Sequence, residues 1–406
     1  MKAAILNVGD EVLSGKIVNT NSSFLAHELE MIGIETLYVS VVGDDQKMLT
    51  NEIKRFNESD CDILITTGGL GPTHDDFTKE VVCGELGLEL ELNEEALKIL
   101  NNYFKGDYAK CNEKQAYFPK EATIIPNLKG TACGAILEKN NKIYVILVGP
   151  PFEMKPMVID TLLPFLKNKI NNDLMIKEYQ VTGIGESAAE EILINLINKY
   201  PYVNVAPYAS VQKIRYQITS HEKYKNEFFE VCEEFESIMD EYIISTTNQT
   251  IEEVVVGKLK ELGYFISTAE SCTGGMISST IVNVNGSSAV FKESVVTYSN
   301  EAKVKYLNVN ESTISKFGVV SKEVVTEMAY GLRKLTGSDV CLTVSGIAGP
   351  TGGSEQKPVG LVHFAILVND ELFTFNKVFR GDREMVRRRA THNCLYEVYK
   401  LLKKIK

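Results

Sequence analysis

The sequence predicts an α/β protein in which two parallel-sheet domains are joined by a small α+β module. Towards both ends of the chain, short apolar runs alternate with segments of helical periodicity, as expected for parallel strands joined by crossover helices. Several of these runs end in glycine-rich polar turns, which mark the loops after the strands. The length of 406 residues exceeds what one core usually holds and favours two or three domains.

The amino-terminal domain is expected at residues 1–170. Asn19 is a suitable cap for a helix whose apolar positions recur at helical spacing, and Gly33 ends that helix. The expected strands cover 3–8, 34–42, 62–67 and parts of 122–148, and the last expected helix covers 152–169. This order predicts a parallel sheet with right-handed crossovers.

Three polar turns follow strands of this domain: residues 9–11 (GDE), 43–45 (GDD) and 68–76 (GGLGPTHDD). Ligands of such sheets bind beyond the carboxyl ends of the strands, where glycines allow close backbone approach. Carboxylates beside a phosphate repel it unless a divalent cation such as Mg²⁺ lies between them. The turns are therefore typical either of a phosphate or pyrophosphate site with an acidic metal clamp, or of ordinary turn glycines and caps. The candidate phosphate contacts are Gly68, Gly69, Gly71 and Thr73, and the candidate metal ligands are Asp44, Asp75 and Asp76.

A small α+β module is expected at residues 171–248. Its expected elements are a strand at 176–182, a helix reaching 197, two strands across 203–219, a helix at 222–241 and a polar linker at 245–250. The segment from Asp173 to Glu241 holds 6 Lys and Arg against 13 Asp and Glu. A nucleic-acid clamp needs a Gly-rich loop with basic neighbours, which Gly183-Ile184-Gly185-Glu186 lacks in so acidic a segment. We expect a spacer or oligomerisation role and no nucleic-acid binding.

The carboxy-terminal domain is expected at residues 249–406 and to form another α/β sandwich. Thr250 and Glu253 have the spacing of a capping box at its first helix. The expected strands cover 264–268, 290–300, 339–345, 359–368 and 371–380, and the expected helices cover 276–282, 301–306, 321–335 and 382–405.

Residues 269–275 (AESCTGG) lie between an expected strand and an expected helix of this domain. Their hydroxyl groups suit a helix cap, a phosphate site or a nucleophile, because backbone N–H groups at a helix start attract anions and oxyanions. As a nucleophile Ser271 needs a base, and the candidate is Lys303. The hydroxyl of Tyr298 is expected either to relay the proton or to hold the lysine. The alternative is that Ser271 and Thr273 cap the helix while Lys303 is solvated.

Several motifs resemble the CinA family of competence/damage-inducible proteins across nearly the whole chain. They are GDEVLSGKIVNTNS, GGLGPTHDDFT, GTACG and GPPFEM in the first domain, and AESCTGG, VTYSNEAK, SGIAGPTGG, KPVGLVHFAI and FRGDREMVR in the last. Cys133 and Val148 depart from the pattern, since the family often has proline there. The resemblance implies a molybdopterin-binding-like first domain, a KH-like middle module, and a last domain that is a nicotinamide mononucleotide (NMN) amidohydrolase.

The resemblance also implies activities and residue roles. The first domain is expected to hydrolyse ADP-ribose-type pyrophosphates with a divalent cation, with Asp76 and Asp44 at acidic site positions. The last domain is expected to deamidate NMN without a cofactor, using Ser271, Tyr298 and Lys303. Contacts with the nucleotide are expected from Thr273, Gly274, Gly349, Thr351, Gly352, Arg383 and Arg387. The alternative is a nucleotide sensor or competence-associated binding protein without turnover.

Composition limits the remaining classes of function. The net charge of −11 without a basic arm disfavours non-specific nucleic-acid binding. The eight cysteines form no Cys-x-x-Cys motif and are expected to be free thiols in a reducing compartment. No apolar run approaches the length of a membrane span, and residues 1–11 lack the features of a signal peptide. We expect a cytoplasmic protein without a membrane partner and, from the family resemblance, a homodimer.

Overall fold

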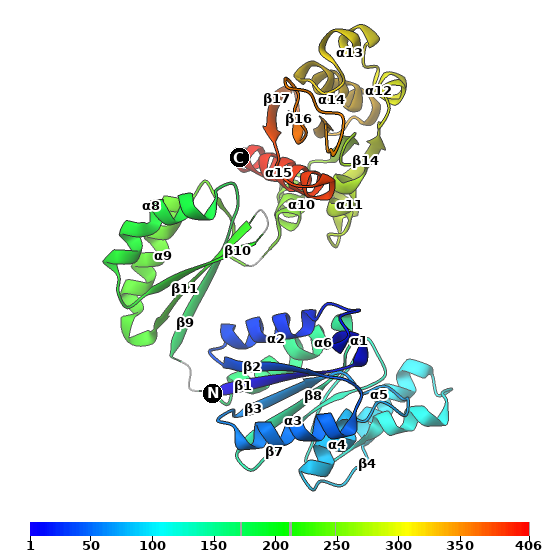
Figure 1. Ribbon diagram of the computed structural model, residues 1–406, viewed down its shortest axis with the longest axis vertical. Helices are drawn as coiled ribbons and strands as arrows, with labels where there is room; N and C mark the ends of the chain where they lie inside the picture. Colours follow the sequence, from blue (N-terminus) through cyan, green and yellow to red (C-terminus); the bar gives the residue numbers. More distant parts are fainter. Residues whose placement is uncertain (171–172, 211–212, 248, 406) are drawn as a thin grey trace. The chain divides into compact units, whose positions relative to one another are not determined.

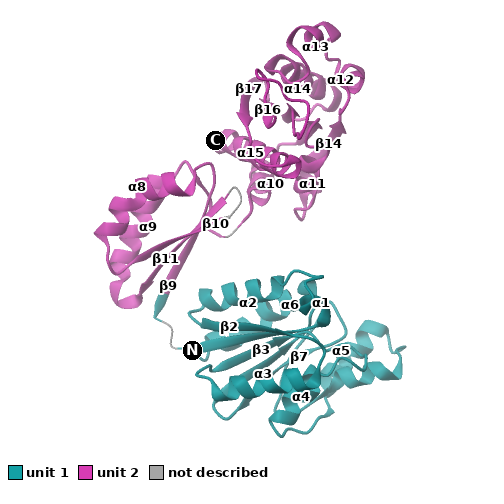
Figure 2. Cartoon of the chain, in the orientation of Figure 1, with its two compact units in different colours: residues 1–174 teal, residues 175–406 magenta. Residues whose placement is uncertain are grey.

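The computed structural model describes residues 1–170, 173–210, 213–247 and 249–405. The chain divides into two compact units, residues 1–174 and residues 175–406 (Figure 2). Within the described ranges, no helix is both long and apolar enough to cross a bilayer. The α/β class predicted from the sequence is confirmed by the sheets and helices of both units.

Unit 1 contains a six-stranded sheet in the order β2-β1-β3-β8-β7-β6. Strands β2, β1, β3 and β8 run parallel to one another, whereas β7 and β6 are antiparallel additions. The strands are β1 (Lys2–Val8), β2 (Glu35–Val42), β3 (Ile63–Thr67), β6 (Thr123–Ile125), β7 (Gly134–Lys139) and β8 (Lys142–Leu147). Figure 1 shows helices on both sides of this sheet. They include α1 (Asp10–Leu13), α2 (Thr20–Met31), α3 (Gln46–Glu58), α4 (Thr78–Glu85), α5 (Glu94–Phe104) and α6 (Pro151–Met157).

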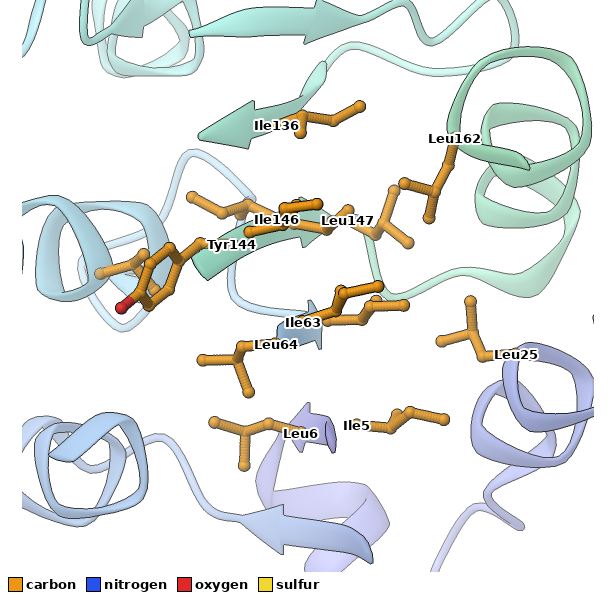
Figure 3. Close-up of a cluster of buried hydrophobic side chains, with 14 of the residues drawn as sticks. Ile5, Leu6, Leu25, Ile63, Leu64, Ile136, Tyr144, Ile146, Leu147 and Leu162 are labelled. Atoms are coloured by element: carbon orange, nitrogen blue, oxygen red, sulfur yellow. The ribbon is translucent and has the colours of Figure 1, made fainter. Parts of the chain in front are cut away.

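Alternating buried side chains explain why this sheet is covered on both faces. In Figure 3, Ile5 and Ile63 point toward Leu25 of α2, while Leu6 and Leu64 point to the opposite side. All five side chains are at most 2% exposed. A parallel strand buried on both faces is apolar at nearly every position, which explains the apolar run at residues 3–6. The polar exception, Asn7, is buried and donates to Oγ of Ser22 and to the carbonyl of Ser40.

The helix predicted over residues 152–169 is interrupted. Helix α6 is followed by a π-helical turn at Val158–Leu162 and then by α7 (Leu163–Lys167). Pro164 has no N–H to donate and its ring crowds the preceding turn, so a regular α-helix cannot continue through it. Helix α5, a 3-10 helix at Lys110–Ala116, and the two-stranded sheet of β4 (Glu91–Leu92) and β5 (Tyr117–Phe118) were not predicted.

Unit 2 begins with a four-stranded sheet in the order β10-β11-β9-β12. Its elements are β9 (Leu174–Val181), α8 (Glu186–Lys199), β10 (Asn204–Ser210), β11 (Lys213–His221), α9 (Lys225–Met239) and β12 (Ile243–Ser245). Buried residues of the two helices and the sheet form one core. The polar linker predicted at 245–250 begins at the end of β12, which pairs with β9; residue 248 lies outside the described residues.

The rest of unit 2 is organised around a sheet in the order β14-β13-β15-β16-β17. Its strands are β13 (Ile266–Glu270), β14 (Phe291–Val296), β15 (Val340–Gly346), β16 (Leu361–Val368) and β17 (Glu371–Val378). Strand β13 pairs in parallel with β14 and β15, while β16 and β17 are antiparallel. Successive residues of β15 face different cores: Cys341 packs with residues of α14 (Lys322–Thr336), and Leu342 packs with residues of α10 (Ile251–Leu262) and α15 (Arg383–Lys403). Helices on both faces make this an α/β sandwich, as predicted.

Local signals placed several helices of this domain correctly. Thr250 and Glu253 form the predicted capping box at the start of α10. Helix α11 (Met276–Val282) has the predicted bounds, and α12 (Asn300–Leu307) extends the predicted helix by one residue at each end. Helix α13 (Glu311–Phe317) was not predicted.

Candidate functional site

The fold of unit 2 brings Ser271 and Lys303 together. Ser271 directly follows β13, and its N–H donates to the carbonyl of Val344 on β15 at 3.2 Å. Lys303 lies on α12, which follows the parallel neighbour strand β14, so both residues come from the same edge of the sheet. The Nζ atom of Lys303 lies 3.0 Å from Oγ of Ser271.

The environment of Lys303 makes its amine easier to deprotonate than that of an exposed lysine. The side chain is fully buried, and burial lowers its pKa to about 8. Its Nζ lies 2.7 Å from the carbonyl oxygen of Thr297 and 3.4 Å from that of Tyr298. Protonated, Lys303 donates to Oγ of Ser271; once deprotonated, the amine has two hydrogens for the two carbonyls and a lone pair that can accept the proton of the Ser271 hydroxyl. This arrangement is suited to general-base activation of the serine.

Tyr298 differs from its expected position. Its side chain is 61% exposed, and its hydroxyl accepts a hydrogen bond from Nη2 of Arg383 at 3.0 Å. The contact with Lys303 is made by the backbone carbonyl of Tyr298 instead of the hydroxyl. The expectation that the tyrosine hydroxyl positions the lysine is therefore corrected: backbone carbonyls position it.

A buried glutamate fixes the turn that carries Ser271. Glu270 is fully buried, and its carboxylate accepts hydrogen bonds from the N–H groups of Gly275, Ile277 and Ser278 at 2.8–3.1 Å. The hydroxyl of Ser278 donates to the same carboxylate at 2.9 Å. These are the N–H groups that a capping side chain normally takes at a helix start. The suggestion that Ser271 and Thr273 cap this helix is therefore wrong, and the hydroxyl of Ser271 is available for Lys303.

Arg387 holds the backbone on the other side of this turn. Its Nε donates to the carbonyl of Cys272 at 3.1 Å, and its Nη2 donates to that of Thr273 at 2.7 Å. In a trans peptide the N–H points away from the carbonyl, so the bond to Cys272 directs the N–H of Thr273 away from Arg387. Within the described residues, the N–H groups of Cys272 and Thr273 have no oxygen partner, and both make hydrogen bonds to the sulfur of Cys272. They are candidates for an oxyanion hole.

The thiol next to Ser271 does not compete as a nucleophile. Cys272 is buried, and burial raises the pKa of its thiol to about 12. The thiol therefore stays protonated near neutral pH, and a thiol is a much weaker nucleophile than a thiolate. The neighbouring Thr273 is also fully buried, and its hydroxyl has no hydrogen-bond partner in the described part of the chain.

The predicted nucleotide contacts of this domain are distributed over three segments. Gly349, Thr351 and Gly352 lie in the loop after β15, and Thr351 and Gly352 are exposed. Arg383, at the start of α15, donates to the carbonyl of Gly349 at 2.8 Å as well as to Tyr298. The loop after β15 and the ring of Tyr298 are therefore joined through one guanidinium group. Gly274 lies in the turn held by Arg387, together with Thr273.

Unit 1 has a separate cavity of about 680 Å³ beyond the carboxyl ends of its parallel strands. The lining includes the predicted residues Gly68, Gly69, Gly71, Asp44, Asp75 and Asp76. Thr73 is not part of this lining; its N–H donates to a carboxylate oxygen of Asp76 at 3.0 Å, and its hydroxyl contacts Asp75 and Asp76. The structure thus gives Thr73 the role of organising the acidic loop.

Backbone geometry requires the two consecutive glycines of this loop. Gly68 has φ = 106°, and a Cβ added there would lie 2.1 Å from the carbonyl oxygen of Val8. Gly69 has φ = 69°, and its Cβ would lie 2.1 Å from Oγ1 of Thr78. Within the described ranges, the N–H groups of Gly69 and Gly71 have no hydrogen-bond partner. Such donors suit a phosphate group.

The acidic residues around this cavity are suited to a cation whose remaining ligands come from the phosphates of a substrate. Among the described residues, no three His, Cys, Asp or Glu side chains form a ready metal-binding group. Burial raises the pKa of Asp44, and the nearby carboxylates of Asp10, Glu11 and Asp75 raise it further. Gathered negative charge of this kind is relieved by a cation. Mg²⁺ is commonly held by one or two carboxylates together with substrate phosphates, which these residues can supply.

Sequence analysis missed residues whose role depends on distant partners. Asn21 donates to Oγ1 of Thr67 at 3.0 Å and to the carbonyl of Gly149 at 2.7 Å, and it lines the cavity of unit 1. Glu270 was predicted only to be part of the AESCTGG motif, without a role of its own. A carboxylate directly before a glycine-rich helix start was a signal for its capping role, because negative side chains are favoured there.

Three family models match successive parts of the chain. Residues 4–168 match a probable molybdopterin binding domain, residues 176–245 match the KH domain of the damage-inducible protein CinA, and residues 248–402 match the CinA C-terminal domain.

Two curated relatives match this chain over nearly its whole length. The chain is 42% identical to a competence-damage inducible protein of Clostridium botulinum (strain Okra / Type B1), over 95% of this chain and 96% of the relative. It is 41% identical to one from Clostridioides difficile (strain 630), over the whole of both chains. A solved competence/damage inducible protein from Agrobacterium tumefaciens is 36% identical, covers 39% of this chain and 99% of its own, and has a TM-score of 0.37.

Proposed function

The chain belongs to the CinA family, and on that premise we propose that its carboxy-terminal domain hydrolyses NMN to nicotinate mononucleotide and ammonia. The observation that supports this activity most is the contact between buried Lys303 and Ser271 at 3.0 Å. A serine next to a lysine of lowered pKa is a nucleophile–base pair, and a carboxamide is a substrate class on which such a pair can act.

In the first step, Oγ of Ser271 attacks the carboxamide carbon while Nζ of Lys303 accepts the hydroxyl proton. The carbonyl oxygen becomes an oxyanion, and the N–H groups of Cys272 and Thr273, which have no oxygen partner in the described residues, donate to it. Lys303 then returns its proton to the amide nitrogen, the C–N bond breaks and ammonia leaves. An ester between Ser271 and the nicotinoyl carbon remains.

In the second step, water replaces ammonia in the site. Lys303 accepts a proton from the water, which attacks the ester carbon, and the same two N–H groups stabilise the second oxyanion. Collapse of this intermediate returns the proton to Oγ of Ser271 and releases the carboxylate. The reaction needs only the turn 269–275, Lys303 and water, so no cofactor takes part.

An ammonia assay with NMN tests this activity. Ser271→Ala is expected to reduce ammonia release by about 10⁴-fold or more, since loss of a nucleophile removes the covalent route. Ser279→Ala, an exposed serine of α11, is the matched control and is expected to retain activity. Binding of NMN to the wild-type protein without ammonia release would identify a nucleotide sensor in place of an enzyme.

For unit 1, the proposal is metal-dependent hydrolysis of an ADP-ribose-type pyrophosphate. The cavity of about 680 Å³, the free N–H groups of Gly69 and Gly71, and the carboxylates of Asp44 and Asp76 support it. A bound Mg²⁺ would supply charge neutralisation for the pyrophosphate. Asp44, Asp75 and Asp76 would hold the cation, and the glycine-rich loop would orient the phosphates.

The second activity is tested by following AMP formation from ADP-ribose. Excess EDTA and Asp76→Asn are each expected to abolish it, whereas Asp60→Asn, an exposed aspartate outside the cavity lining, is expected to leave it unchanged. Turnover that persists in EDTA would show that the carboxylates do not act through a metal.

A further inference from the structure

Unit 2 has a pocket between the KH-like module and α15, and neither proposed reaction uses it. Its volume is about 540 Å³, within the range of small-molecule sites. The lining comes from the loop before α8, from β11, from β17 and the residues after it, and from α15. Ser271 and Lys303 are not part of it.

The packing around this pocket joins the KH-like module to α15. A Cβ on Gly183 would lie 2.5 Å from the ring of Tyr396, so the loop and the helix touch. The hydroxyl of Tyr396 donates to the carbonyl of Glu241 at 3.2 Å, and Nζ of Lys403 lies 3.0 Å from a carboxylate oxygen of Asp240. These contacts give the pocket defined walls on both sides.

The pocket gathers positive charge. Lys213, Lys377, Arg380 and Arg389 line it, against the single carboxylate of Glu186 among the described lining residues. In the described part of the chain, Lys377, Arg380 and Arg389 form no ion pair with an acidic side chain. Cations gathered without anionic partners repel one another, and a bound anion removes that repulsion.

Two further features of the lining favour an anion. The pocket is bordered by Gly185, the N-cap residue of the 14-residue helix α8. Because glycine has no side chain to accept hydrogen bonds, the N–H groups of the first helical turn remain available. His392 also lines the pocket, and burial and nearby Lys213 lower its pKa to about 4. The neutral ring offers a hydrogen-bond donor without adding to the repulsion.

The size and surroundings of the pocket select a compact anion over a polyanion. Extended nucleic acid is attracted by broad positive surfaces, whereas this chain has a net charge of −11 and its KH-like segment is acidic. These four cations are gathered in one pocket lining that also contains the buried rings of Phe379 and Tyr396. Such a lining can pack against the apolar part of a ligand while the cations hold its phosphates.

We propose that this pocket is a binding site for a phosphate-bearing ligand of nucleotide size. Lys377, Arg380 and Arg389 hold the phosphates, and the first turn of α8 provides N–H donors to them. Arg389 is kept in place by its own hydrogen bond to the carbonyl of Arg380. The site is separate from both proposed reactions.

Isothermal titration calorimetry of the full chain with ATP tests this proposal. Excess EDTA suppresses metal-dependent binding in unit 1. Salt at about 0.15 M screens weak attraction between ATP and surface charges. Wild-type protein is expected to show one saturable site, and Lys377→Gln with Arg380→Gln is expected to weaken it by about tenfold or more. Lys316→Gln with Lys334→Gln removes two exposed charges outside the pocket and is the matched control.

Charge-preserving variants separate loss of binding from loss of structure. Lys377→Arg is expected to retain ATP binding, and circular dichroism is expected to show the same fold for every variant. Absence of saturable binding to the wild-type protein, or equal affinity in the double Gln variant and the wild type, would overturn the proposal. A single-stranded RNA that binds more tightly than ATP, and loses affinity in the same double variant, would replace it with a nucleic-acid site.

Discussion

Two buried lysines, one in each unit, have similarly lowered pKa values but different neighbours. Lys303 is fully buried and Lys79 is 4% exposed, and burial lowers the pKa of each to about 8. Lys303 contacts a serine hydroxyl, whereas Nζ of Lys79 donates to the carbonyl of Lys114 at 2.6 Å and lies 4.5 Å from the ring centroid of Phe118. Desolvation alone therefore produces a lysine that loses its proton easily. A nucleophile within hydrogen-bond distance is what makes such a lysine a base.

The largest expected effect follows directly from this difference. Lys303→Met is expected to lower kcat/KM for NMN deamidation by about 10³-fold, the size of a general-base contribution. Lys79→Met makes the same chemical change in the other unit and is expected to leave ammonia release unchanged. Steady-state ammonia assays of both variants measure this. Substantial activity in Lys303→Met would show that Ser271 has another base.

The kinetics of an Arg387 variant can distinguish a positioning role for this residue from a substrate-binding role. If it holds the carbonyls of Cys272 and Thr273, Arg387→Gln is expected to lower kcat by roughly 10–100-fold with little change in KM, because the oxyanion donors lose their orientation. Arg388→Gln is the control, since Arg388 is exposed and paired with Glu384 at 2.7 Å. A rise in KM with kcat preserved would instead indicate a direct contact with the substrate.

The pH dependence of the amidase tests the lowered pKa of Lys303. The base is active when neutral, so kcat/KM is expected to rise about tenfold per pH unit below pH 8 and to level off above it. A rate profile from about pH 6 to pH 9.5 measures this directly. A profile that is flat over this range would contradict a role for Lys303 as the base in the free enzyme.

Much of the fold was predictable because its signals are local. The capping box of Thr250 and Glu253, the cap at Asn19 and the doubly buried run at 3–8 each define an element from a few neighbouring residues. The order of strands and helices then placed the polar turns at the carboxyl edge of each sheet. The cavity of unit 1 and the turn that carries Ser271 both lie where this rule puts them.

What could not be predicted depends on contacts between distant residues. Arg387 reaches the carbonyl of Cys272 across 115 positions of sequence, and periodicity carries no signal for such a bond. The hydroxyl of Tyr298 was expected to hold Lys303, yet it contacts Arg383, which lies 85 positions further along the chain. The pocket beside His392 is built from four separate segments, so none of them alone predicts it.

The smallest expected effect concerns a property that the two lysines share. A lysine whose pKa is about 8 in the folded protein and about 10.4 when unfolded binds fewer protons in the folded state between those values. Stability then rises with pH through this window, because the unfolded state binds more protons. Below pH 8 each buried lysine carries its charge at the full desolvation penalty, and above it the penalty is progressively removed.

Replacing either lysine by methionine removes this dependence. Relative to each Met variant, the wild-type protein is expected to gain about 2 kcal/mol of unfolding free energy between about pH 7 and pH 9.5, since one pKa unit corresponds to about 1.4 kcal/mol. Thermal unfolding of wild type, Lys303→Met and Lys79→Met at both pH values measures the gain. Equal gains for the two lysines, with activity lost in only one variant, would show that burial sets the proton affinity while Ser271 alone gives it a catalytic use. A gain in unfolding free energy for Lys303 but none for Lys79 would show that the two lysines do not share a lowered pKa.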